Sequence, residues 1–225
     1  MQALQRFTTR FTGAVRRASL SAGLGHILPL FNIAQSSNAN AAGDEPPPEG
    51  INDNLYKLRI YKLATKLKCS DSPEERMETI RTMSHLSWTG GPEVAEFSGE
   101  HYLELLINIL RKTSEPQCVK IEIVKALSEI LRMNKANQDR ARQYGLIDIL
   151  SNYLMHINRE MRMWSTHALF FLLCGNTENQ LAALEKPKQQ LQMRFIRVVT
   201  DDWSTWSHNE ARECIEMLGL GRFEH

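Results

Sequence analysis

Residues 126–138 (ALSEILRMNKANQ) and residues 168–180 (ALFFLLCGNTENQ) are two copies of one pattern. Each copy is an apolar helical run that opens with Ala-Leu and ends in the phrase Asn-x-x-Asn-Gln. A constant shift of 42 residues (168−126) aligns the copies, and it also aligns Ala141 with Ala183. Self-similarity at such a period is typical of repeat proteins, in which each helical unit buries its apolar face against the next unit. The chain is therefore predicted to be a stack of helical repeats.

Helical signals continue on both sides of this pair. Ser72-Pro73 with two following glutamates indicates a helix start, because a capping side chain and a proline precede acids at the positive end of the helix dipole. Gly90-Gly91 is expected to end that helix, with Trp88 packed under the turn. Residues 92–97 are expected to form a short helical piece, and Ser98-Gly99 to turn the chain. No stretch alternates apolar and polar residues for long enough to indicate a strand.

The order of short helix, glycine turn, medium helix, loop and long helix with an Ala-Leu pair resembles the armadillo repeat. Residues 145–179 look like a nearly complete copy, residues 99–138 resemble a second, and weaker copies lie upstream and downstream. The small size and the single block resemble the armadillo-like helical domain-containing proteins. The resemblance implies an all-α fold, an armadillo/HEAT-type right-handed helical solenoid (an α-α superhelix) over residues 51–222.

Armadillo proteins bind an extended peptide in a concave groove lined by the third helix of each repeat, and the resemblance implies such a groove here. In the nuclear-import adaptors of this family, a Trp before the Ala-Leu pair and an Asn one turn later hold the peptide backbone. The matching positions lack that Trp-Asn pair, which argues against recognition of basic import signals. The predicted partner-binding residues are Arg81, His85, Lys125, Glu129, Trp164, His167, Phe171, Glu213 and Met217.

Three of these residues form an aromatic cluster. Trp164 lies three residues before His167 and Phe171 lies four residues after it, so all three share one helical face. Large aromatic side chains often dominate the energetics of interfaces, which makes the cluster a candidate anchor for a partner helix or peptide. The alternative is that Trp164 and Phe171 pack against the next repeat. Trp203 and Trp206 are expected to cap the last repeat.

No catalytic or cofactor-binding motif is found in the sequence. The four cysteines lie far apart, without C-x-x-C spacing, and a chain of this size does not need structural disulfides. The seven histidines are scattered. Asp201-Asp202 is interpreted as a helix end, with cation binding as the alternative. We therefore expect a non-enzymatic protein with no catalytic residue, no cofactor and no metal.

Residues 1–50 are expected to be an N-terminal arm and a proline-rich linker, mostly disordered or forming a single helix. Residues 1–43 contain four arginines and no lysine or acidic residue, with apolar residues at helical spacing in the first part. This composition is typical of a mitochondrial transit peptide, while a disordered basic tail and a secretory signal are the alternatives. The apolar run in the arm is too short for a transmembrane helix. A cytoplasmic location is expected, with a mitochondrial location as the alternative.

The net charge of +1 combines +4 in residues 1–43 with 23 basic and 26 acidic residues in the rest of the chain. A mildly acidic body gives no electrostatic reason to expect nucleic acid as a ligand. The predicted function is a protein–protein interaction module that binds a protein or peptide partner through the concave face of its third helices, without stable insertion into a membrane. The oligomeric state is left open. A structural or assembly subunit of a larger complex and a mitochondrially imported armadillo-like protein are the alternatives.

Overall fold

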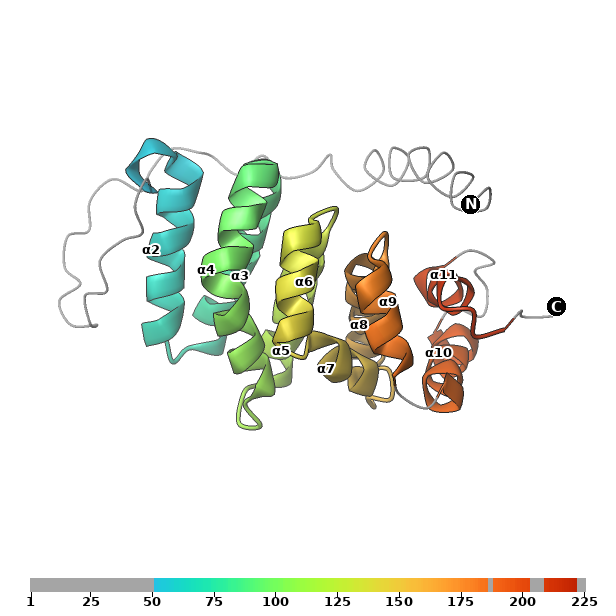
Figure 1. The fold of residues 1–225 in the computed structure, drawn as a ribbon. Helices are drawn as coiled ribbons and strands as arrows, with labels where there is room; N and C mark the ends of the chain where they lie inside the picture. Colours follow the sequence, from blue (N-terminus) through green and yellow to red (C-terminus); the bar gives the residue numbers. More distant parts are fainter. Residues whose placement is uncertain (1–50, 186–187, 203–208, 222–225) are drawn as a thin grey trace. The chain divides into compact units, whose positions relative to one another are not determined.

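A computed structural model describes residues 51–185, 188–202 and 209–221 of the chain (Figure 1). These residues form helices joined by turns and loops, with no β-strand within the described ranges. The all-α prediction is therefore confirmed. The expectations for the arm and linker at residues 1–50, and for Trp203 and Trp206, lie outside the described residues.

The described chain folds into ten α-helices and one short 3-10 helix. In chain order they are η1 (Ile51–Asp53), α2 (Leu55–Cys69), α3 (Pro73–Thr89), α4 (Pro92–Arg111), α5 (Gln117–Leu131), α6 (Lys135–Gln143), α7 (Leu146–Tyr153), α8 (Arg159–Leu173), α9 (Thr177–Leu184), α10 (Lys188–Asp202) and α11 (Glu210–Met217). Helix α3 starts as predicted, with Ser72 as its N-cap and Pro73 in its first turn.

Eight of the described helices form two rows in which each helix packs against its counterpart in the next repeat, and α7 and α10 pack against α8 and α11. Helix α3 contacts α5, α5 contacts α8, and α8 contacts α11. A second row runs from α2 through α4 and α6 to α9, and Figure 1 shows these helices one beside the next. The two central members of the first row, α5 and α8, thus have neighbours on both sides. This position explains why most of their residues are buried.

The apolar residues of the repeated pattern form the core of this stack. Leu127 and Leu131 of α5 are buried, and so are Leu169 and Leu173, which occupy the same places on α8 one repeat later. The 42-residue period therefore arises because each repeat buries equivalent leucines against its neighbours.

The Asn-x-x-Asn-Gln phrase starts a helix in each repeat. Asn134 is the N-cap of α6, and Asn176 is the N-cap of α9. Each side-chain oxygen accepts a hydrogen bond from the backbone N–H of the asparagine three residues later, over 2.9 and 3.2 Å respectively. The first asparagine of the phrase therefore satisfies a backbone donor that the helix itself leaves unpaired.

The second asparagine of the phrase joins neighbouring repeats. The side chains of Asn137 and Asn179 are fully buried. Each donates a hydrogen bond to the carbonyl oxygen seven residues earlier in its own repeat, over 3.0 and 2.8 Å. A second hydrogen bond runs to the preceding repeat, from Asn137 to the carbonyl of Ala95 (2.8 Å) and from Asn179 to that of Gln138 (3.1 Å). The phrase occurs twice because both of these junctions have backbone carbonyls that need a donor.

The predicted turn at Ser98-Gly99 is wrong. Helix α4 runs without interruption from Pro92 to Arg111, and both residues lie inside it. Gly99 is needed for packing, because a Cβ atom at this position would lie 1.9 Å from Oδ1 of Asn137. The Ser98 hydroxyl donates to the carbonyl of Val94 within the same helix. Glycine is common in turns, which is why the sequence predicts one here, but Gly99 instead allows the Asn137 side chain to approach the helix closely.

The predicted burial of Trp88 is also wrong. Helix α3 ends at Thr89 with Gly90 as its C-cap, as expected, but 47% of the Trp88 surface is exposed. Its ring is covered on one side by the guanidinium of Arg132, which lies 4.9 Å from the ring centroid. Trp88 therefore packs against Arg132 of the neighbouring repeat, and not under the turn at Gly90-Gly91.

Candidate protein-binding surface

The nine predicted partner-binding residues all lie on the helices of the row α3, α5, α8 and α11. They are Arg81 and His85 on α3, Lys125 and Glu129 on α5, Trp164, His167 and Phe171 on α8, and Glu213 and Met217 on α11. We call the surface that these positions define the third-helix face. The repeat period explains this placement, since residues about 42 positions apart occupy equivalent places on successive helices.

Charged side chains link the helices of the third-helix face in a series. Arg81 on α3 donates two hydrogen bonds to the carboxylate of Glu122 on α5, over 3.2 and 3.4 Å. Lys125, one turn further along α5, pairs with Glu160 on α8 at 2.8 Å. The bonds to Glu122 stabilise the charged guanidinium, so the pKa of Arg81 is raised above its ordinary value. These cations are therefore already neutralised by carboxylates of the neighbouring repeat.

Trp164 lies between this charged series and the aromatic residues of α8. The Lys125 ammonium lies 5.2 Å from the centroid of the indole ring, within the range of a cation–π contact. On the other side, the His167 ring meets the indole edge-on at a centroid distance of 5.4 Å. The indole is only half-buried, so part of it remains accessible beside these contacts.

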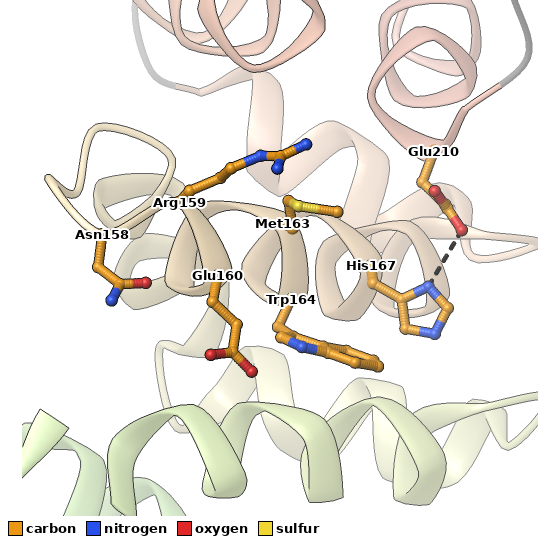
Figure 2. A pocket seen from close by; sticks show the side chains of 7 residues that line it. All are labelled: Asn158, Arg159, Glu160, Met163, Trp164, His167 and Glu210. Atoms are coloured by element: carbon orange, nitrogen blue, oxygen red, sulfur yellow. Dashed lines mark hydrogen bonds and ion pairs between the residues drawn. The ribbon is translucent and has the colours of Figure 1, made fainter. Parts of the chain in front are cut away.

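A cavity of about 510 Å³ opens beside Trp164 (Figure 2). Its lining comes from the start and middle of α8 and the first turn of α11, through Asn158, Arg159, Glu160, Met163, Trp164, His167 and Glu210. The lining combines an indole, a thioether and an imidazole with polar groups, as small-ligand and peptide sites do. Two of the predicted residues, Trp164 and His167, thus lie in one cavity.

His167 and Glu210 close one end of this cavity, where Figure 2 shows their side chains joined. His167 Nδ1 lies 3.2 Å from Glu210 Oε1. Burial raises the pKa of the Glu210 carboxyl, but hydrogen bonds from His167 and from the backbone outweigh burial, and the pKa lies below its ordinary value. Glu210 is therefore held as a carboxylate in the cavity wall.

Phe171 is part of the packing. Only 7% of its surface is exposed, and its ring contacts His167 at a centroid distance of 4.8 Å. The Arg132 guanidinium lies 4.6 Å from the Phe171 ring and also covers Trp88, so it joins α3 to α8 across the end of α5. Of the two interpretations that the sequence left open for Phe171, the structure matches packing against the neighbouring repeat.

The remaining predicted residues lie on the row but outside the cavity. Glu129 forms an ion pair with Arg132 at 3.0 Å. His85 is exposed on α3, and Glu213 and Met217 are half-exposed on α11. The structure brings Trp164 and His167 together in one cavity, and it spreads the other positions along the row.

Sequence reasoning missed the acidic members of this surface, Glu122, Glu160 and Glu210. A signal was present for two of them, because Glu122 lies 41 residues after Arg81 and Glu210 lies 43 residues after His167. Residues one repeat apart are neighbours in a stack, so oppositely charged or polar pairs at this spacing can be expected to meet. The pair of Lys125 with Glu160, at a spacing of 35, follows no such rule.

Neither metal-binding nor membrane-spanning features occur in the described part of the chain. No cluster of three His, Cys, Asp or Glu side chains there has the geometry to hold a metal ion. Among the described helices, none combines the length and apolarity needed to cross a bilayer. Asp201-Asp202 ends α10 as expected, and the Asp202 carboxylate is buried against an arginine. All four cysteines are free thiols.

Two rows of short helices that repeat every 42 residues, joined by buried asparagines, define an armadillo-like helical domain. The comparison with known families agrees with this class. The chain belongs to the family of armadillo-like helical domain-containing protein 2, whose sequence profile matches residues 51–222. A search of curated protein sequences gave no match.

Proposed function

We propose that this protein is a non-enzymatic interaction module, a right-handed helical solenoid that binds a peptide or helix of a partner protein on the concave side of its third helices. The observation that carries the proposal is the cavity of about 510 Å³ beside Trp164, on the row formed by α3, α5, α8 and α11. Armadillo-like helical domains are typically scaffolds, and the family membership supports this class of function.

The contacts on the third-helix face indicate what the partner inserts there. Arg81 and Lys125 are paired with carboxylates, and His167 is bonded to Glu210. A charged partner residue competes with these pairs and has to break one of them. An uncharged side chain only has to cover the indole of Trp164 and the thioether of Met163, both half-buried. The preferred anchor is therefore an apolar or aromatic side chain.

The test compares the partners of the wild-type chain with those of two cavity variants, Trp164→Ala and Met163→Glu. Each full-length chain is fused to a biotin ligase and expressed in the cells that contain the protein, and biotinylated neighbours are identified by mass spectrometry. We expect both variants to lose the same set of neighbours, because one removes the anchor and the other places a charge in its path.

The matched control is Leu181→Ala, which changes an exposed apolar residue on α9 and lies outside the third-helix face. It should keep the wild-type set of neighbours. Melting temperatures within about 2 °C of wild type are required of all three variants, so that loss of the fold is not read as loss of binding. Unchanged neighbours for folded Met163→Glu and Trp164→Ala contradict the proposal.

A further inference from the structure

A second surface lies at the start of α8, where the loop between α7 and α8 meets α10. Ile157 in this loop has 91% of its surface exposed, and Met155 has 45% exposed. Met193, on α10, has 64% exposed and lies one turn before Arg197, whose guanidinium reaches the Met155 sulfur at 4.0 Å. We call Met155, Ile157 and Met193 the loop patch.

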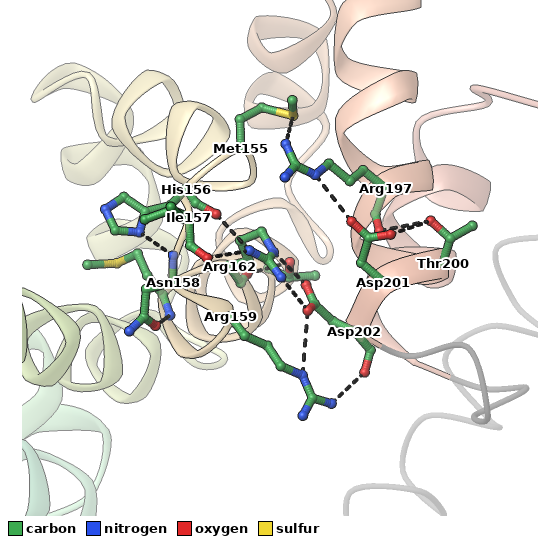
Figure 3. Close-up of polar contacts among 12 residues, drawn as sticks. Met155, His156, Ile157, Asn158, Arg159, Arg162, Arg197, Thr200, Asp201 and Asp202 are labelled. Atoms are coloured by element: carbon green, nitrogen blue, oxygen red, sulfur yellow. Dashed lines mark hydrogen bonds and ion pairs between the residues drawn. The ribbon is translucent and has the colours of Figure 1, made fainter.

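The loop that carries Ile157 is held rigidly (Figure 3). The Arg162 guanidinium donates to the carbonyl oxygens of His156 (2.8 Å) and Ile157 (3.0 Å). Arg162 is buried, and its other nitrogens donate to both carboxylate oxygens of Asp202 at 2.8 and 2.7 Å. Asn158 closes the loop, since its backbone N–H donates to His156 Nδ1 over 3.0 Å. The exposed isoleucine is therefore displayed on a fixed backbone.

A fixed and exposed apolar side chain has a particular energetic meaning. A single exposed apolar residue on a mobile loop is ordinary in proteins. Here a buried bidentate ion pair orders the loop before any partner arrives, so a partner that covers Ile157 does not have to order it. Rigid and pre-ordered apolar side chains are the kind that act as anchors at interfaces.

The charges around the loop patch are mainly positive. Three arginines at the surface lie around it, Arg159, Arg194 and Arg197. With the buried pair of Arg162 and Asp202 and the carboxylate of Asp201, the cluster has a net charge of +2. Arg194 bonds only neutral oxygens in these contacts, the carbonyl of Ser151 and the amide of Asn152, so no carboxylate offsets its charge there. A planar guanidinium is well suited to bind carboxylates.

We infer that the loop patch is a docking surface for an acidic amphipathic segment of a partner protein, which places its apolar side chains on Ile157 and the two methionines and its carboxylates on Arg159, Arg194 and Arg197. This surface adjoins the cavity beside Trp164, because Arg159 lines both, but none of the three apolar residues of the loop patch lines that cavity. A protein is favoured over a membrane, since the apolar area is limited to three side chains and the cluster holds only two excess charges.

The experiment uses the full-length chain and two fluorescein-labelled amphipathic peptides, with leucines on one helical face and either glutamates or lysines on the other. Binding is followed by fluorescence anisotropy. We expect the glutamate peptide to bind at least roughly tenfold more tightly than the lysine peptide, and its affinity to fall as salt is raised.

Ile157→Asp should weaken binding of the glutamate peptide by roughly tenfold or more. Arg197→Gln should weaken it by a smaller factor and reduce the salt dependence. Both side chains are exposed or half-exposed, so neither change disturbs the core. The matched control, Leu181→Asp, places the same charge on an exposed apolar site of α9 and should leave binding unchanged.

Four outcomes overturn the inference. Equal affinity for the two peptides, or no effect of Ile157→Asp, removes the loop patch as an acidic docking surface. Capture of the chain by phosphatidylserine vesicles, lost in Ile157→Asp while the peptides do not bind, assigns the surface to a membrane instead. If the chain self-associates in sedimentation experiments, Ile157→Asp abolishes this association and the peptides do not bind, the loop patch is assigned to a second copy of this chain.

Discussion

At the scale of the single residue, Met133 has a backbone conformation that favours glycine. Its φ angle is +55°, and it is the only residue other than glycine with positive φ among those that the structure describes. The 42-residue shift aligns it with Gly91 (φ +83°) and Gly175 (φ +70°), which occupy the same turn in the neighbouring repeats. The Met133 side chain is 77% exposed, so no buried contact explains the departure from glycine.

Met133→Gly is predicted to stabilise the protein by about 1 kcal/mol. The strain of a positive φ angle at methionine is relieved, and this gain is larger than the cost of the extra conformational entropy that glycine gives the unfolded chain. The reciprocal change, Gly175→Ala, should destabilise it by about the same amount. Urea unfolding of both variants measures the two effects. Destabilisation by Met133→Gly means that the methionine makes a contact in solution that outweighs the strain.

At the scale of the helix, the fold depends on side chains that join one helix to the next. Buried Asn137 bonds a carbonyl of its own repeat and one of α4 in the preceding repeat, and Gly99 leaves the space that it occupies. Polar side chains of this kind cannot be replaced by apolar ones, since the carbonyls they satisfy would remain buried and unpaired.

Asn137→Ala is predicted to lower the free energy of unfolding by about 2–4 kcal/mol, because two buried carbonyl groups lose their donor. The control, Asn108→Ala, removes an exposed asparagine that bonds Arg111 on the surface of α4, and it should cost less than about 0.5 kcal/mol. Both are measured by urea unfolding. A loss of stability as small as that of the control excludes Asn137 as a joint between repeats.

The contact between α8 and α11 is predicted to weaken in acid. The pKa of Glu210 lies below its usual value of 4.5, so its charged form is favoured in the folded state, with the unfolded chain binding the proton more readily. Its stabilising contribution is therefore complete above that usual value and is lost as the pH falls through the folded-state pKa.

Glu210→Gln tests this sign, because glutamine keeps the shape and removes the titration. The difference in stability between wild type and Glu210→Gln should be constant near neutral pH and change in favour of the variant as the pH falls below 4.5. Thermal unfolding across this pH range measures it. A difference that is the same at all pH values means that the His167–Glu210 contact makes no charge-dependent contribution.

At the scale of the whole molecule, packing of successive repeats buries side chains such as Cys214. Cys214 of α11 is fully buried, while Cys69 and Cys118 are exposed. Burial raises the pKa of the Cys214 thiol well above its usual 9.0, and the nearby carboxylates of Glu210 and Glu213 add to this effect. The thiolate, which is the reactive form, is scarce at this site.

Cys214 is therefore predicted to react with iodoacetamide only when the stack opens, whereas Cys69 and Cys118 react in the native protein. Mass spectrometry of the labelled chain in increasing urea should show Cys214 labelling along the unfolding transition. All four thiols should react alike in the fully unfolded chain. Labelling of Cys214 as fast as that of Cys118 without denaturant means that α11 opens independently of the rest.

The period of the sequence was sufficient to predict the helical class, although the sequence placed a turn inside α4. Leucines and asparagines recur at a shift of 42 because each repeat has the same core and the same buried carbonyls. The nine positions predicted from this period lie on one row of helices for the same reason. Helix caps such as Ser72 are local features, and local features can be read from sequence.

Only the tertiary structure decided what each of those residues contacts. The sequence predicted a turn at Gly99, but the structure shows that Gly99 makes room for Asn137. Trp88 is exposed against the prediction, and for Phe171 the structure decided between the two interpretations left open. The exposure of Ile157 and the pairing of Lys125 with Glu160 could not be read from the periodicity. The physical reason is that a repeat pattern indicates which positions face the neighbouring repeat. Hydrogen bonding, burial and backbone strain at such a position depend on which side chain of the neighbouring repeat contacts it.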